Sequence, residues 1–203
     1  MEQIYNQITV RGSLQNLPEY SHENHGKRFF RFYLEIPRLS GAVDTLPVVA
    51  EERILNGVDL SGGDMITVIG QIRSHNIRLG GIRRLMVFIF ALDMTVDDGE
   101  PLNDVTILGP LCREPVYRQT PLGREICDVM LAVPRAFKRA DYLPCILWGR
   151  TAVEVSRCHT SDQLLITGRL QSRTYTKLTE DGPVQRTTYE ISALTAEVLD
   201  DSI

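Results

Sequence analysis

The residues best suited to contacting a ligand lie in one short apolar run, Asp141–Arg150, which contains the only tryptophan of the chain. In a β-strand, successive side chains point to opposite faces of the sheet. The predicted core face holds Leu143, Cys145 and Leu147, and the other face holds Tyr142, Pro144, Ile146, Trp148 and Arg150. Two rings and a cation on one exposed face could stack on unpaired bases and contact phosphate. The alternative is that Trp148 packs in the core, as most tryptophans do.

Composition indicates a globular protein of one or two domains. The chain has 203 residues, 43% of them hydrophobic and 24% charged, which is ordinary for a protein with a buried core. It has no apolar run of about 20 residues and no signal-peptide pattern, so we expect a cytoplasmic protein. The net charge of −4 argues against strong nucleic-acid binding, but residues 102–196 carry a small excess of Lys and Arg. We therefore expect phosphate contacts mainly in the second half.

No residue pattern favours catalysis, a cofactor or a metal. The four cysteines form no C-x-x-C pair, and we expect reduced, mostly buried thiols. His22 and His25 lie three residues apart in a polar segment without further ligands, which is not typical of a metal site. A phosphate-binding Gly-rich loop, a nucleophile elbow and a Ser/His/Asp arrangement are all missing from the sequence. We therefore expect no enzymatic activity, no cofactor and no metal.

An internal repeat divides the chain into two copies. Asn6–Leu14 returns as Asn103–Leu111, 97 positions later. Residues 69–72 return as residues 167–170 at a spacing of 98. The repeat length of about 95–100 residues is an ordinary domain size. We predict a first domain over residues 1–96, a charged Gly/Pro-containing linker over 97–102 and a second domain over 103–199.

Both copies have the same predicted elements. The first copy has strands near residues 3–14, 30–36, 45–50, 65–73 and 84–94 and a helix near 51–56. The second has strands near 103–111, 127–133, 141–150, 164–173 and 187–198 and a helix near 151–158. Turns are expected at Gly80-Gly81 and at Glu180–Pro183. Five strands with a helix after the third predict an all-β protein of two tandem OB-fold five-stranded Greek-key barrels, with one short helix per domain. A generic β-sandwich would not explain that helix.

Residues 103–198 resemble the bacterial single-stranded DNA-binding protein family. The resemblance rests on Asn103–Leu111, Leu147-Trp148-Gly149-Arg150, residues 166–175 and residues 186–191, in that order. It implies sequence-tolerant binding of single-stranded DNA in replication, recombination or repair. It also implies a homodimer presenting four OB domains, with replication or repair proteins as further partners. The family's long acidic tail would be reduced here to residues 199–203.

The resemblance also implies a set of site residues in the second copy. Base-stacking positions of the family fall on Phe137, Tyr142, Trp148 and Tyr175. Nearby cations that would contact phosphates are Arg135, Lys138, Arg150, Arg169, Arg173 and Lys177, with Arg139 beside them. The equivalent ring positions of the first copy hold Ser40, Thr45, Glu51 and Ile77. We therefore expect the first copy to be a degenerate OB domain that acts in assembly or as a weak extension of the groove.

Two other functions fit the same sequence. One is an OB-fold protein-interaction module of a primosome or replisome, with weak or secondary nucleic-acid binding, which the negative net charge favours. The other is RNA or tRNA binding, because OB folds serve both purposes.

Overall fold

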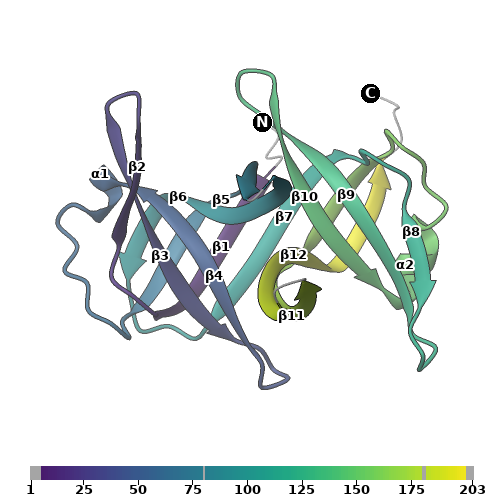
Figure 1. Cartoon of the computed structure of the whole chain (residues 1–203), viewed down its shortest axis with the longest axis horizontal. Coiled ribbons are helices and arrows are strands. Elements are labelled where there is room, and N and C mark those ends of the chain that lie inside the picture. The colour runs from purple at the N-terminus through teal and green to yellow at the C-terminus, as the bar shows by residue number, and fades with distance from the viewer. Residues whose placement is uncertain (1–5, 80, 180–181, 200–203) are drawn as a thin grey trace.

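The computed structural model describes residues 6–79, 81–179 and 182–199 (Figure 1). Within these residues the chain forms twelve strands and two short helices. The first unit comprises β1 (Asn6–Leu14), β2 (Glu19–Asn24), β3 (Lys27–Pro37), β4 (Val43–Glu51), α1 (Glu52–Leu55), β5 (Met65–Leu79) and β6 (Ile82–Val96). The second unit comprises β7 (Leu102–Pro110), β8 (Val116–Gln119), β9 (Glu125–Arg135), β10 (Arg139–Trp148), α2 (Gly149–Val155), β11 (Gln163–Thr179) and β12 (Gly182–Leu199). Residues 3–5, Gly80, Glu180, Asp181 and residues 200–203, which carried predicted strand, turn and tail features, lie outside the described part.

Each unit is a closed barrel with the predicted topology. In the first, β1 pairs antiparallel with both β5 and β3, β3 pairs with β4, and β4 pairs parallel with β6. The second unit repeats this order, with β10 parallel to β12 and a bridge between Leu111 and Leu131 at the closing edge. The short helix follows the third barrel strand in both units. This is the OB plan, so the predicted fold class is confirmed.

The barrel interiors are filled by side chains. Inward residues of the strands, such as Ile8, Phe32, Leu143 and Ile166, have no exposed surface. A fully buried side chain of this size contributes about 1.5–3 kcal/mol through removal of apolar surface from water. Because the interiors are packed, the ligand-binding surface must lie on the outside of the barrels.

The repeated glycines of the two copies mark the points where each barrel bends. A Cβ on Gly168 would lie 2.2 Å from the carbonyl oxygen of Ser192, and one on Gly70 would lie 2.3 Å from that of Phe90. Both glycines stand beside a register shift, between β5 and β6 or between β11 and β12. Only glycine allows the paired strands to approach this closely at the bulge, which explains why the sequence repeat includes it.

Two strands and several element ends differ from the sequence prediction. The strands β2 and β8 were not predicted, because all of their residues are exposed and no hydrophobic alternation marks them. The last two strands of each unit extend beyond their predicted ends into long hairpin arms, for the same reason. The second helix begins at Gly149 and ends at Val155 rather than covering residues 151–158. No helix in the described ranges is long and apolar enough to cross a membrane.

The two units are related by an approximate twofold axis (Figure 1). β1 pairs antiparallel with β7, and Ile8 lies opposite its own repeat equivalent, Val105. The β11–β12 arm of the second unit reaches β4 of the first, and the β5–β6 arm of the first reaches β10 of the second. All twelve strands therefore form one continuous hydrogen-bonded sheet across both units.

Buried carboxylates connect each arm to the neighbouring unit. Asp44 accepts hydrogen bonds from the backbone N–H of Ser172 at 2.6 Å and from the guanidinium of Arg38. At the equivalent place, Asp141 accepts from the N–H of Ser74 at 2.8 Å and pairs with an arginine. The same contact occurs twice, once in each direction across the approximate twofold axis.

Candidate nucleic-acid interface

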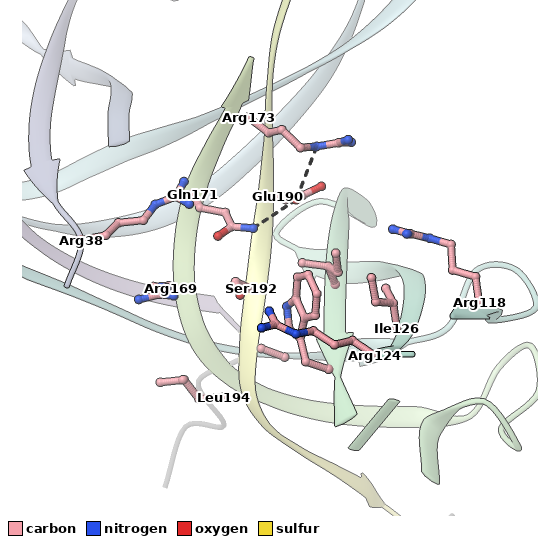
Figure 2. Close-up of a pocket in the computed structure, with 13 residues that line it drawn as sticks. Arg38, Arg118, Arg124, Ile126, Arg169, Gln171, Arg173, Glu190, Ser192 and Leu194 are labelled. Atoms are coloured by element: carbon pink, nitrogen blue, oxygen red, sulfur yellow. Dashed lines mark hydrogen bonds and ion pairs between the residues drawn. The ribbon is translucent and has the colours of Figure 1, made fainter. Parts of the chain in front are cut away.

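A shallow groove of about 650 Å³ lies on the outside of the second unit, and we call it the second-unit groove (Figure 2). It is bordered by β8, β9, β10, β11 and β12 and by Arg38, which directly follows β3 of the first unit. Its lining includes five arginines and a single carboxylate: Arg38, Arg118, Arg124, Arg169, Arg173 and Glu190. An excess of positive charge in a concave surface raises the local concentration of polyanions.

Glu190 occupies the centre of this arginine set (Figure 2). Its carboxylate accepts a hydrogen bond from Gln171 Nε2 at 3.1 Å and lies 3.7 Å from Arg173 Nε. One long ion pair leaves most of the five N–H donors of Arg173 free to bind another acceptor. In the described part of the chain Arg124 and Arg169 form no ion pair, and Arg169 Nε is buried without a hydrogen-bond partner. The groove therefore offers several unused donors for phosphate oxygens.

Trp148 forms part of the same groove. It ends β10, where Gly149 adopts a φ of +59° and turns the chain into α2. Its side chain is 40% exposed, and Tyr142 at the other end of the strand is exposed as well. The predicted alternation of β10 is therefore observed at both rings. Ile146, expected on the exposed face, is instead only 6% exposed because it forms the floor of the groove.

Phe137 lies elsewhere, at the tip of the β9–β10 hairpin. Its ring is 93% exposed, and both Phe137 and Lys138 have positive φ angles, of 63° and 54°. Left-handed backbone at two consecutive non-glycine residues is strained, and such strain is characteristic of functional loops. Phe137 and Arg135 line a second groove of about 620 Å³, the hairpin groove, together with Arg73 of the first unit.

The structure brings together only part of the predicted set. Trp148, Arg169 and Arg173 meet in the second-unit groove, and Phe137 and Arg135 meet in the hairpin groove. Outside both grooves lie Tyr142, Tyr175, Lys138, Arg150 and Lys177. Of these, Tyr175 has the Arg173 guanidinium 5.9 Å from its ring centroid, and Arg150 pairs with Glu154 at 2.8 Å.

Sequence reasoning missed three arginines of the second-unit groove. Arg118 lies on β8, and Arg124 lies just before β9, in a hairpin whose exposed first strand shows no hydrophobic alternation. Arg118 pairs with Asp128 at 2.7 Å, and this hydrogen bond raises the pKa of the guanidinium. Arg38 belongs to the first copy in the sequence and directly follows β3. The structure places it in the groove of the second unit, where its Nη2 donates to the carbonyl oxygen of Ser172 at 2.8 Å.

The first unit has an ion cluster where the second has Trp148. Glu51 pairs with Lys27 and with Arg53, each at 3.2 Å. Burial acts to raise the pKa of Glu51, but the two cations outweigh it and the pKa is lowered. At the position equivalent to Trp148 the first unit therefore carries a paired, ionised acid and no ring on which a base could stack.

These features define a tandem OB-fold protein with an arginine-rich outer groove. The whole chain superposes on crystal structures of the single-stranded DNA-binding protein from Thermus aquaticus. The wild-type protein matches with a TM-score of 0.79 and 24% identity over 98% of this chain and 94% of that chain. A deletion mutant of it matches with a TM-score of 0.78 and 23% identity, over 100% of this chain and 98% of that chain. Both structures have the two-barrel fold in common with this chain.

Sequence comparison then identifies the family. The model of the Single-strand binding protein family matches residues 102–199. Single-stranded DNA-binding protein B of Bacillus subtilis is 32% identical over 108 residues, which cover 50% of this chain and 87% of that protein. Single-stranded DNA-binding protein 1 of Lactococcus lactis is 35% identical over 81 residues, covering 36% of this chain and 54% of that protein. The chain belongs to the Single-strand binding protein family. Because this is a family of binding proteins, the expectation of a non-enzymatic protein is confirmed.

Proposed function

We propose that the chain binds single-stranded DNA with little sequence preference, mainly through the second-unit groove. The observation that carries the proposal is the combination of five arginines with the exposed ring of Trp148 in one groove. Arginines follow the phosphate backbone, and an aromatic ring stacks on any base. The relatives from Bacillus subtilis and Lactococcus lactis are named for this activity, which supports the proposal.

Trp148→Ala tests the groove directly. Binding to fluorescently labelled oligo-dT, measured by anisotropy, is expected to weaken. The binding free energy should become less favourable by about 1–3 kcal/mol, the usual contribution of one base stack. Glu51→Ala is the matched control, because it removes the side chain at the equivalent position of the first unit and is expected to change the affinity little. Unchanged binding by Trp148→Ala would contradict the stacking role.

The wild-type protein provides the second measurement. Its only tryptophan is Trp148, so oligo-dT is expected to quench the intrinsic tryptophan fluorescence, less so as salt rises. Weak, unsaturable quenching together with a stable protein complex would favour the interaction-module alternative. Stronger competition by matched RNA than by oligo-dT would favour RNA binding.

We further propose that two chains associate to present four OB units in replication, recombination or repair, in the cytoplasm and on the nucleoid. This proposal includes the division of the chain into two domains by a linker over residues 97–102. The strand β6 ends just before this linker, and β7 begins at its last residue. Leu92, which the pairing of β5 with β6 skips at the bulge, is 46% exposed, lines neither the second-unit groove nor the hairpin groove and offers apolar surface to a second copy. Sedimentation equilibrium is expected to show a dimer, and Leu92→Asp is expected to weaken it. A monomer at micromolar concentration would contradict this association.

A further inference from the structure

One acid stands among the arginines of the second-unit groove. Glu190 is the single carboxylate of the described lining, and its side chain is 12% exposed. It lies on β12, opposite Gln171 of β11. A carboxylate repels a phosphate and weakens the attraction of the arginines around it. A strand bound in this groove therefore has its phosphates near the arginines of the rim and away from Glu190.

The carboxylate of Glu190 retains unused acceptor positions. Its Oε1 accepts a hydrogen bond from Gln171 Nε2 at 3.1 Å and lies 3.7 Å from Arg173 Nε (Figure 2). Its Oε2 accepts no hydrogen bond from a described residue and is not sealed off from solvent. The two oxygens of a carboxylate together offer about four lone-pair positions, so Oε1 also has one left. Glu190 can therefore accept two further hydrogen bonds, one on each oxygen.

An apolar floor lies beside this acceptor. Ile126 of β9 and Ile146 of β10 line the groove, and both side chains are nearly buried. Ile146 is paired with Ser192, which follows Glu190 by two residues on the same face of β12. A flat base can lie against such a surface, as it can on the ring of Trp148 at the end of β10. The edge of a base that lies on this floor can reach the carboxylate.

A carboxylate distinguishes the four bases by their hydrogen-bond donors, because it accepts and does not donate. Guanine presents two neighbouring donors on its Watson–Crick edge, N1–H and N2–H, which match the two oxygens of a carboxylate. Cytosine and adenine each present one amino group beside a ring nitrogen that is itself an acceptor. Thymine presents one N–H between two carbonyl oxygens, and a carboxylate repels both of them. Guanine is therefore the base that suits Glu190 best, and thymine suits it least.

We propose that Glu190 is a specificity-determining residue, which accepts hydrogen bonds from the Watson–Crick edge of one guanine and makes the second-unit groove prefer guanine to thymine at that nucleotide. The inference rests on the proposed function, since it concerns the same ligand in the same groove. Binding along the rest of the strand stays tolerant of sequence, because it uses phosphate contacts and stacking.

The test compares strands of about 10 thymine nucleotides, the length that one OB fold covers, in which a single central base is varied. Wild-type protein is expected to bind the strand with a central guanine at least about fivefold more tightly than the all-thymine strand, measured by anisotropy. Hypoxanthine, which lacks the 2-amino group of guanine, should lose most of this gain, whereas 7-deazaguanine should keep it. An arginine would read guanine through O6 and N7 instead, so the opposite pattern would overturn the inference. Equal binding of the guanine and thymine strands would overturn it as well.

Glu190→Gln tests the residue itself. The variant keeps the size of the side chain but replaces one acceptor oxygen by a donor, so it should bind the guanine and thymine strands within about twofold of each other. Glu197→Gln is the matched control, because Glu197 lies on the same strand, is exposed and does not line the groove. It removes the same charge and should leave the preference for guanine unchanged. A preference that persists in Glu190→Gln, or disappears in Glu197→Gln, would refute the assignment.

Trp148→Ala separates this inference from the proposed function. It should weaken the binding of the guanine and thymine strands by the same factor, because stacking on a ring tolerates any base. If wild type shows no preference for guanine but Trp148→Ala still weakens both strands, the inference fails and the proposed function stands.

Discussion

Replacing Asp44 by asparagine should destabilise the connection between the two units. Asp44 is 1% exposed, and its carboxylate accepts two hydrogen bonds from Arg38 and two from Ser172. Asparagine keeps the size and one oxygen but removes the charge and an acceptor. The hydrogen bond to Asp44 raises the pKa of Arg38 despite the opposing effect of burial.

The expected loss can be worked out from these contacts. A hydrogen bond to a charged group contributes about 1.5–3 kcal/mol, and the arginine makes two of them. The Arg38 side chain is 21% exposed, so water replaces part of what is lost. We expect Asp44→Asn to lower the free energy of unfolding by about 3 kcal/mol, at the lower end of the range for breaking a buried ion pair.

Equilibrium unfolding in urea measures this loss. With a slope of about 2 kcal/mol per molar, the midpoint should fall by about 1.5 M. Trp148 fluorescence reports on the second unit, although the substitution is in the first, so a shifted fluorescence midpoint shows that the units unfold together. Asp59→Asn, at an exposed carboxylate without an ion pair in the described structure, is the control and should leave the midpoint unchanged.

Asp141 is the equivalent carboxylate of the second unit and provides the comparison for Asp44. Among the described residues, Asp141 accepts only from Ser74 N–H, at 2.8 Å, and from Arg135, at 3.3 Å. Asp141→Asn should therefore cost about half as much as Asp44→Asn. A midpoint that falls further for Asp141→Asn than for Asp44→Asn, or the same midpoint for Asp44→Asn and the control, would refute the assignment.

Three further outcomes are expected. Gly168→Ala should lower the free energy of unfolding by about 1–3 kcal/mol, measured by thermal unfolding, because its Cβ would meet the Ser192 carbonyl. Gly62→Ala is the control and should leave the stability unchanged, because a Cβ there meets nothing within 4 Å. Iodoacetamide should modify the exposed Cys112 in the native protein and the three buried thiols only after unfolding, as peptide mapping would show. Arg124→Gln should reduce the slope of log affinity against log salt by about 0.7 for single-stranded DNA, and an unchanged slope would remove that arginine from the interface.

Much of the fold follows from local patterns in the sequence. The repeat and the turn residues predict two OB units, because each barrel strand alternates between a packed interior and an outer face. Asn6–Leu14 and Asp141–Trp148 show this alternation, and both lie in strands of the structure, whereas Gly149 and Arg150 begin the helix α2. The strands β2 and β8 bury no side chain, so no periodicity marks them.

The candidate site could be predicted only where one strand presents it. Trp148 and Tyr142 share a face of β10, which alternation determines without knowledge of the rest of the molecule. The loss of the family's ring positions in the first copy was equally visible. The meeting of His22, His75 and Phe88 around one hollow of the first unit was not visible, because these residues come from three different strands.

The sequence by itself determined the two barrels, their order and the outward rings of β10, since these depend on hydrophobic alternation and turn chemistry along one strand. Only the tertiary structure decided which unit completes which groove. Arg38 and Arg135 each leave their own barrel and line a groove of the other. The cause is the antiparallel pairing of β1 with β7 and the reach of the hairpin arms, which bring together residues more than 100 positions apart, such as Asp44 and Ser172. No local pattern encodes such a meeting, because it depends on how two finished barrels pack against each other.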